Sequence, residues 1–145
     1  MALSILEGAK KWTVLLLFVG LTFSCCGCSW FMKRAIGPWG LRDIKGSFDA
    51  NTKTVYVSFR FLDSVVDILD YRLKGERLDG GTKYRLTLFG QHIGKSTDVK
   101  ARQNHQIRRI DGRYEVQLKL DSFDITHDQL VYWYRGQEYP IKIGK

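Results

Sequence analysis

The feature that most constrains this 145-residue chain is a single long apolar run, which occupies residues 12–32. Basic pairs stand on both sides of it, Lys10-Lys11 before and Lys33-Arg34 after. The run also holds all three cysteines of the protein: Cys25, Cys26 and Cys28. A segment this long and this apolar is more than a small domain needs for its core, so the sequence predicts a protein that works at a membrane.

The first half of the run resembles the leader of a bacterial prolipoprotein. Lys10-Lys11 supplies a basic region, Thr13 to Phe23 forms an apolar core of secretory-signal length, and the small residue Ser24 stands directly before Cys25. In that class the cysteine becomes the lipidated N-terminus of the mature protein. The resemblance therefore implies a fatty acid such as palmitate on Cys25, with Cys28 as the alternative. It also implies a domain that faces the periplasm, at the outer membrane in preference to the inner one.

The same run is also long enough to stay in the chain as a membrane anchor, because a bilayer core needs roughly 20 helical residues. Trp12, Trp30 and Phe31 would then lie at the two interfaces. Secretion of a cleaved product without a lipid is a third alternative. The predicted organisation is a signal peptide or anchor at 1–24, a lipidated tether at 25–43 and a folded domain at 44–145.

The composition of the remaining residues predicts one folded domain rich in strands. About 120 residues are enough for a single domain with a modest core. Aromatic residues make up 13% of the chain and prolines number only 2, which argues against disorder. Since no cysteine follows Cys28, the fold depends on packing without disulfides, and the domain has no thiol for catalysis.

Alternating apolar residues predict the strands. Thr54 to Phe61 alternates strictly, and a turn at 49–53 joins it to a strand at 44–48 as a hairpin. Further strands are expected at 84–89, 106–110, 113–120, 130–134 and 138–143. The pair Asp111-Gly112 is typical of a tight hairpin turn, and Pro140 indicates an edge strand.

Leu62 to Leu73 is the ambiguous segment. Its apolar residues recur at helical spacing, so a short helix or irregular crossover is expected, with a strand from Ile68 as the alternative. Seven or so short strands with little helix predict a mainly β fold. The expected form is a small antiparallel β-sandwich, immunoglobulin-like or transthyretin-like in the loose sense, and a small barrel is second.

A cluster of basic residues forms the predicted contact surface: Lys95, Lys100, Arg102, Arg108, Arg109 and Arg113. Cations on an edge strand can simply prevent aggregation through the sheet edge. Alternatively, they bind anionic lipid headgroups or an acidic protein partner. Nucleic acid is not expected as a partner, because an exported chain seldom meets it.

No cofactor or nucleotide is expected. Gly90 and Gly94-Lys95-Ser96 are separated by three residues, whereas a phosphate-binding loop needs four, so a hairpin turn explains both glycines. Asp63, Asp67 and Asp70 have the spacing of the solvated face of a helical turn.

No catalytic or metal site is expected either. His92, His105 and His127 lie in separate predicted loops without the spacing of metal ligands. Asp128 could orient the His127 imidazole, but no serine stands in a nucleophile context. The predicted function is therefore a non-enzymatic structural or assembly component of a membrane-associated envelope complex. The alternatives are a single-span subunit of such a complex and a lipid- or ligand-binding periplasmic lipoprotein, which would need an apolar cavity.

Overall fold

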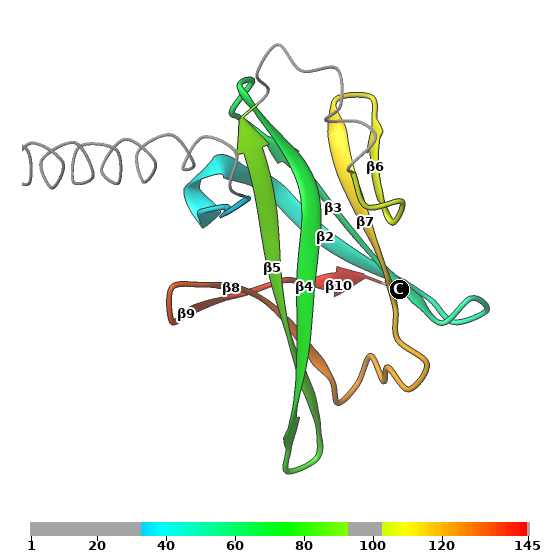
Figure 1. The fold of residues 1–145 in the computed structure, drawn as a ribbon. Coiled ribbons are helices and arrows are strands. Elements are labelled where there is room, and N and C mark those ends of the chain that lie inside the picture. Colours follow the sequence, from blue (N-terminus) through cyan, green and yellow to red (C-terminus); the bar gives the residue numbers. More distant parts are fainter. Residues whose placement is uncertain (1–32, 93–102, 145) are drawn as a thin grey trace, which may run out of the picture. The chain divides into compact units, whose positions relative to one another are not determined.

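The computed structural model describes residues 33–92 and 103–144 (Figure 1). The chain divides into two compact units, Met1–Met32 and Lys33–Lys145, and every described residue belongs to the second. We call this second unit the β unit. The predictions made for the leader and its cysteines therefore lie outside the described residues.

The prediction of a mainly β fold is confirmed. The β unit contains β1 (Arg34–Ala35), the 3-10 turn η2 (Pro38–Gly40), β2 (Leu41–Asp49), β3 (Thr54–Phe61), β4 (Val66–Leu78), β5 (Gly81–His92), β6 (Ile107–Ile110), β7 (Arg113–Lys119), β8 (Gln129–Tyr134), β9 (Gln137–Pro140) and β10 (Ile143–Gly144). No α-helix occurs in residues 33–92 and 103–144. Among the same residues, no helix has the length and apolar character that crossing a membrane requires.

The strands form two five-stranded sheets. In the first sheet, one side of β5 pairs with β4. On the other side, the start of β5 pairs with β8 and the end of β5 pairs with β1. β9 then pairs with β8 at the sheet's edge, which confirms the prediction from Pro140. The second sheet has the order β10-β2-β3-β7-β6, in which β10 runs parallel to β2, and in the first sheet β8 runs parallel to β5. The prediction of an antiparallel arrangement is therefore wrong for these two pairs, because a long stretch of chain and not a hairpin joins the strands of each pair.

Side chains from both sheets form one hydrophobic cluster. In β3 the alternate residues Val55, Val57 and Phe59 are fully buried, and in β5 Leu86 and Leu88 are buried in the same cluster. This agrees with the expected period of two for strands with one apolar face. Each such side chain stabilises the fold by about 1.5–3 kcal/mol relative to an exposed position.

The prediction of a helix or crossover for Leu62 to Leu73 is wrong, because most of this segment belongs to β4. Ile68 pairs with Gly90 and Asp70 pairs with Phe89, which leaves Leu69 as an extra residue in a β-bulge. Both Ile68 and Leu69 are buried. The bulge shifts the alternation by one residue, so the apolar positions on its two sides imitate helical spacing.

Gly90 is not in a hairpin turn, contrary to the prediction, but lies within β5. A Cβ atom at this position would stand 2.6 Å from Val66 Cγ1 and 2.7 Å from Ile36 Cδ1. Glycine therefore lets the side chains of Val66 on β4 and of Ile36, which follows β1, approach the backbone of β5. The reason for this glycine is close packing and not turn geometry.

The segment before residue 44 is built into the first sheet at residues 33–36. Ile36 is buried, its N–H donates to the Leu88 carbonyl at 2.9 Å, and its carbonyl accepts a hydrogen bond from the Tyr132 hydroxyl at 2.5 Å. The chain thus enters its first strand at Arg34. The predicted tether at 25–43 accordingly includes β1, η2 and the start of β2.

Polar bonds tie the first half of β4 to β7 and to Asn104 in the segment before β6. The Asn104 N–H donates to the Leu69 carbonyl at 2.8 Å, and the Tyr114 hydroxyl donates to the Asp67 carboxylate. Burial, together with this bond to Asp67, raises the pKa of Tyr114 to about 12. Asp70 accepts from Asn104 at 3.2 Å. Asp67 and Asp70 therefore accept hydrogen bonds from other segments at the edge of β4. Their interpretation as the solvated face of a helical turn is wrong.

Candidate functional site

The residues chosen from the sequence fall into two groups. The lipidation candidates Cys25 and Cys28, and the cations Lys95, Lys100 and Arg102, lie outside the described residues. Arg108 and Arg109 lie on β6 and Arg113 begins β7, so the structure brings these three together on one hairpin. We call this hairpin, residues 107–119, the basic hairpin.

Arg113 is fixed by an acid that the sequence analysis did not select. Its Nη2 donates to the Asp43 carbonyl at 3.1 Å, and its Nη1 lies 4.0 Å from Asp43 Oδ2. Arg60 Nε lies 3.6 Å from the same carboxylate oxygen. Asp43 adopts a φ of 52° where the pairing of β2 with β3 shifts register. Asp tolerates this left-handed conformation better than most residues, which is the local signal for its position.

The other two arginines of the basic hairpin remain exposed. The Arg109 guanidinium carbon stands 5.4 Å from the centre of the Tyr114 ring, a cation–π distance. Arg108 lies opposite Glu115 in the register of β6 and β7. The hairpin therefore presents two exposed guanidinium groups, one of which is held over an aromatic ring.

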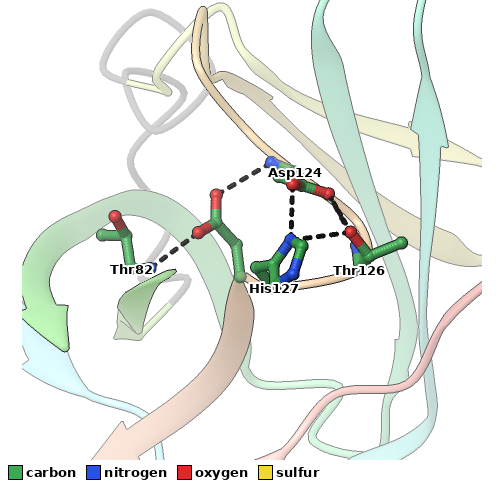
Figure 2. Close-up of polar contacts among 5 residues, drawn as sticks. Thr82, Asp124, Thr126 and His127 are labelled. Atoms are coloured by element: carbon green, nitrogen blue, oxygen red, sulfur yellow. Dashed lines mark hydrogen bonds and ion pairs between the residues drawn. The ribbon is translucent and has the colours of Figure 1, made fainter. Parts of the chain in front are cut away.

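A second polar group forms around the turn at residues 124–128, which precedes β8 (Figure 2). Asp124 Oδ1 accepts from the Thr126 backbone N–H at 2.9 Å and from its hydroxyl at 2.5 Å. Asp128 Oδ2 accepts from the Asp124 N–H at 2.8 Å, and Asp128 Oδ1 accepts from the Thr82 N–H at 2.6 Å. The two carboxylates therefore satisfy the backbone of the turn and fasten it to the start of β5.

The sequence suggests Asp128 as the partner of the His127 imidazole, but in the structure the imidazole pairs with Asp124. His127 Nδ1 lies 2.7 Å from Asp124 Oδ2 (Figure 2). The hydrogen bond and the charge of Asp124 raise the pKa of His127 above its usual 6.5. Hydrogen bonds from Thr126 and His127 in turn hold the pKa of Asp124 well below its usual value. The spacing of aspartate, threonine and histidine in one turn was the signal for this pair.

This turn and the β4–β5 hairpin line an open hollow of about 490 Å³. Its lining is polar and apolar in equal measure and consists of Arg77, Leu78, Gly80, Gly81, Thr82, Asp124, His127 and Asp128. Asp124 and Asp128 already accept hydrogen bonds from the turn. Among residues 33–92 and 103–144, no three His, Cys, Asp or Glu side chains are grouped so as to hold a metal ion. The carboxylates that line the hollow therefore hold the turn in place against β5.

Comparison of the chain with family models, with curated proteins and with solved structures finds no match.

Proposed function

We propose that this protein is a membrane-anchored cell-envelope lipoprotein whose β unit is a β-sandwich, and that it acts as a non-enzymatic structural or assembly component of a larger membrane-associated complex. The sandwich, immunoglobulin-like or transthyretin-like in the loose sense, is supported by the single hydrophobic cluster to which both sheets contribute. The carboxylates of Asp67, Asp124 and Asp128 accept hydrogen bonds that fasten a strand edge and a turn, which are structural roles.

The observation that carries the proposal is the position at which the β unit begins. Its first residue, Lys33, directly follows the apolar run, and β1 starts one residue later. If Cys25 carries the lipid, eight residues lie between it and β1, a span of at most about 32 Å when fully extended. A lipid on Cys25 would therefore hold the domain close to the bilayer surface.

Acyl labelling tests the anchor. Cells that express the full chain are grown with radioactive palmitate, and wild type is compared with Cys25→Ser, Cys28→Ser and, as a matched control, Cys26→Ser. We expect label on wild type and on Cys26→Ser, and its loss in Cys25→Ser. If only Cys28→Ser loses the label, the lipid is attached to Cys28, the alternative residue. An unlabelled, full-mass product that stays in carbonate-washed membranes supports the uncleaved anchor, and an unlabelled product that is freely soluble overturns membrane anchoring altogether.

An open strand edge supports the role in assembly. Within the described part of the chain, residues 72–78 of β4 pair only with β5, and they end in the hairpin at the foot of Figure 1. Lys74, Glu76 and Arg77 are exposed along this edge. Unpaired backbone groups on such an edge can accept a strand from a partner, while the charges discourage indiscriminate pairing.

Site-specific photocross-linking tests for the partner. A photoreactive residue replaces Arg77 at the edge of β4 or, as a control, Asn51 in the exposed turn between β2 and β3. In intact membranes we expect one discrete cross-linked product from position 77 and none from position 51. Equal, diffuse products from both positions would contradict a protein contact at this edge.

A further inference from the structure

We propose that the end of the β unit at which the chain enters, at Lys33, lies flat on the membrane and binds anionic lipid headgroups. This inference rests on the proposed membrane anchor and goes beyond it, because an anchor alone leaves the orientation of the domain free. We call this end the anchor-proximal end and define it as residues 33–43, 60–67 and 108–113.

Strand register brings these three segments together. Arg34 pairs with Gly90 near the end of β5, and Leu41, which follows η2, pairs with Phe61 at the end of β3. The Leu62 N–H also donates to the Gly40 carbonyl at 3.1 Å. Tyr114 pairs with Phe59, so the turn that joins β6 to β7 lies at the same end of β3. In Figure 1 this end of the strands lies opposite the β4–β5 hairpin.

The exposed large apolar side chains of the described residues gather at this end. The four most exposed are Trp39 at 70%, Leu62 at 61%, Val65 at 52% and Ile110 at 50%. The two remaining ones are less exposed, Leu78 at 38% and Trp133 at 36%. Trp39 packs edge-on against Tyr134 at a centroid distance of 5.3 Å, which holds its ring in place. Tryptophan is the residue typical of a membrane–water interface.

Positive charge is also concentrated at the anchor-proximal end, and negative charge at the opposite end. The anchor-proximal end has seven cations, Lys33, Arg34, Arg42, Arg60, Arg108, Arg109 and Arg113, and four acids, Asp43, Asp63, Asp67 and Asp111, a net charge of +3. All of these cations except Arg113 are exposed. At the opposite end, residues 74–82 and 121–128 contain Lys74 and Arg77 against Glu76, Asp79, Asp121, Asp124 and Asp128, a net charge of −3.

The distribution of exposed apolar side chains and the distribution of charge favour the same orientation of the β unit on a membrane. An anionic bilayer attracts the basic end and repels the acidic end, and the four most exposed apolar side chains leave water only when the basic end faces the bilayer. The apolar run joins the β unit at Lys33, which is part of the same end. Lipid headgroups fit this surface better than a protein partner does, because the membrane is brought to it by the chain itself.

Fluorine NMR of the full-length protein measures this orientation. Trp30, Trp39 and Trp133, together with Trp12 where the leader is retained, are labelled with 5-fluorotryptophan, and the protein is placed in anionic phosphatidylglycerol nanodiscs that contain a gadolinium-labelled lipid. The Leu78→Trp variant adds a reporter at the far end of β4, about 40 Å along the strand from the anchor-proximal end. We expect the relaxation enhancement of Trp39 to be several-fold larger than that of this added reporter.

Variants separate docking from simple tethering. In Leu62→Ser/Ile110→Ser, two exposed side chains lose their apolar groups, and we expect the enhancement at Trp39 to fall several-fold. The matched control, Leu78→Ser, should leave it unchanged. Replacement of the anionic lipid by phosphatidylcholine should also reduce it. An enhancement at Trp39 that ignores both the double substitution and the lipid charge would overturn the docking proposal.

Trp30 separates this proposal from the anchor on which it rests, since this residue stays in the chain whether the leader is removed before Cys25 or retained. Strong enhancement at Trp30, with Trp39 no larger than the Leu78→Trp reporter, overturns docking and leaves the anchor standing. If neither Trp30 nor Trp39 responds, the anchor proposal and the docking proposal are both wrong.

Discussion

Asp124 shows at the scale of single residues how polar groups serve the backbone in this protein. Its carboxylate accepts from Thr126 and pairs with His127 within one turn. Asp128, four residues later, returns a hydrogen bond to the Asp124 N–H. Both carboxylates satisfy nearby backbone donors, and Ile125 of the same turn packs against the hydrophobic cluster, so polar and apolar contacts together fix the turn.

His127 should stabilise this turn more strongly while it is protonated. Its pKa is raised above 6.5 in the folded protein, so the charge-dependent part of its contribution is complete below the unfolded value and is lost as pH rises through the folded value. We expect the difference in urea midpoint between wild type and His127→Gln to be larger near pH 5 than near pH 9. A difference that is constant across this range would contradict the pairing with Asp124.

Tyr132 provides a second test at this scale. Its buried hydroxyl donates to the Ile36 carbonyl at 2.5 Å, and burial raises the pKa of this phenol. Tyr132→Phe should lower the free energy of unfolding by about 1–2 kcal/mol, because it leaves that buried carbonyl without its donor. Tyr139→Phe is the matched control, since its hydroxyl bonds to the exposed Gln137 side chain, and it should change little. Equal effects from the two variants would show that the hydrogen bond from Tyr132 to the Ile36 carbonyl does not stabilise the fold.

At the scale of elements, the turn at 124–128 is packed against the start of β5. A Cβ atom at Gly81 would stand 2.2 Å from the His127 carbonyl oxygen, a backbone atom with little freedom to move. The link between the two sheets through residues 121–128 therefore depends on a glycine at the beginning of β5. The same close approach places Thr82 within reach of Asp128.

Gly81→Ala should consequently destabilise the fold by about 1–3 kcal/mol, as in other overpacked sites. Gly75→Ala in the neighbouring strand is the control, because its nearest atom would be Thr82 Cγ2 at 3.5 Å, an ordinary contact. We expect the control to change the free energy of unfolding by less than about 0.5 kcal/mol. Urea unfolding monitored by circular dichroism measures both. A neutral Gly81→Ala would mean that the turn does not rest on β5.

At the scale of the whole molecule, the β unit contains its own core. The members of its hydrophobic cluster extend from Ile36 to Ile141. The segment at 33–43 belongs to that unit, since Ile36 and Leu41 are both buried. The β unit therefore has the core of a domain that can fold by itself.

A fragment of residues 33–145 should accordingly unfold cooperatively in urea. A fragment of residues 44–145 is the comparison, because it lacks β1 and the buried side chains of Ile36 and Leu41. We expect the shorter fragment to be less stable by at least about 3 kcal/mol, as for the loss of buried aliphatic side chains. Equal stability of the two fragments would place the boundary of the unit near residue 44.

The sequence by itself determined the regular strands of this protein. The strand Thr54–Phe61 has the predicted bounds, and Pro140 lies on a sheet edge as expected. Both follow from local rules, because a period of two and a missing N–H act within one strand. The basic hairpin was foreseen for the same reason, since Asp111-Gly112 specifies a tight turn by itself.

Only the tertiary structure decided which distant residues meet. Arg113 bonds to Asp43 across 70 positions and Tyr132 to Ile36 across 96 positions. The bulge at Leu69, where the Asn104 N–H bonds to the Leu69 carbonyl, likewise depends on a segment far along the chain. Such contacts follow from the order and register of strands in two sheets, and a local pattern of apolar and polar residues does not encode that order.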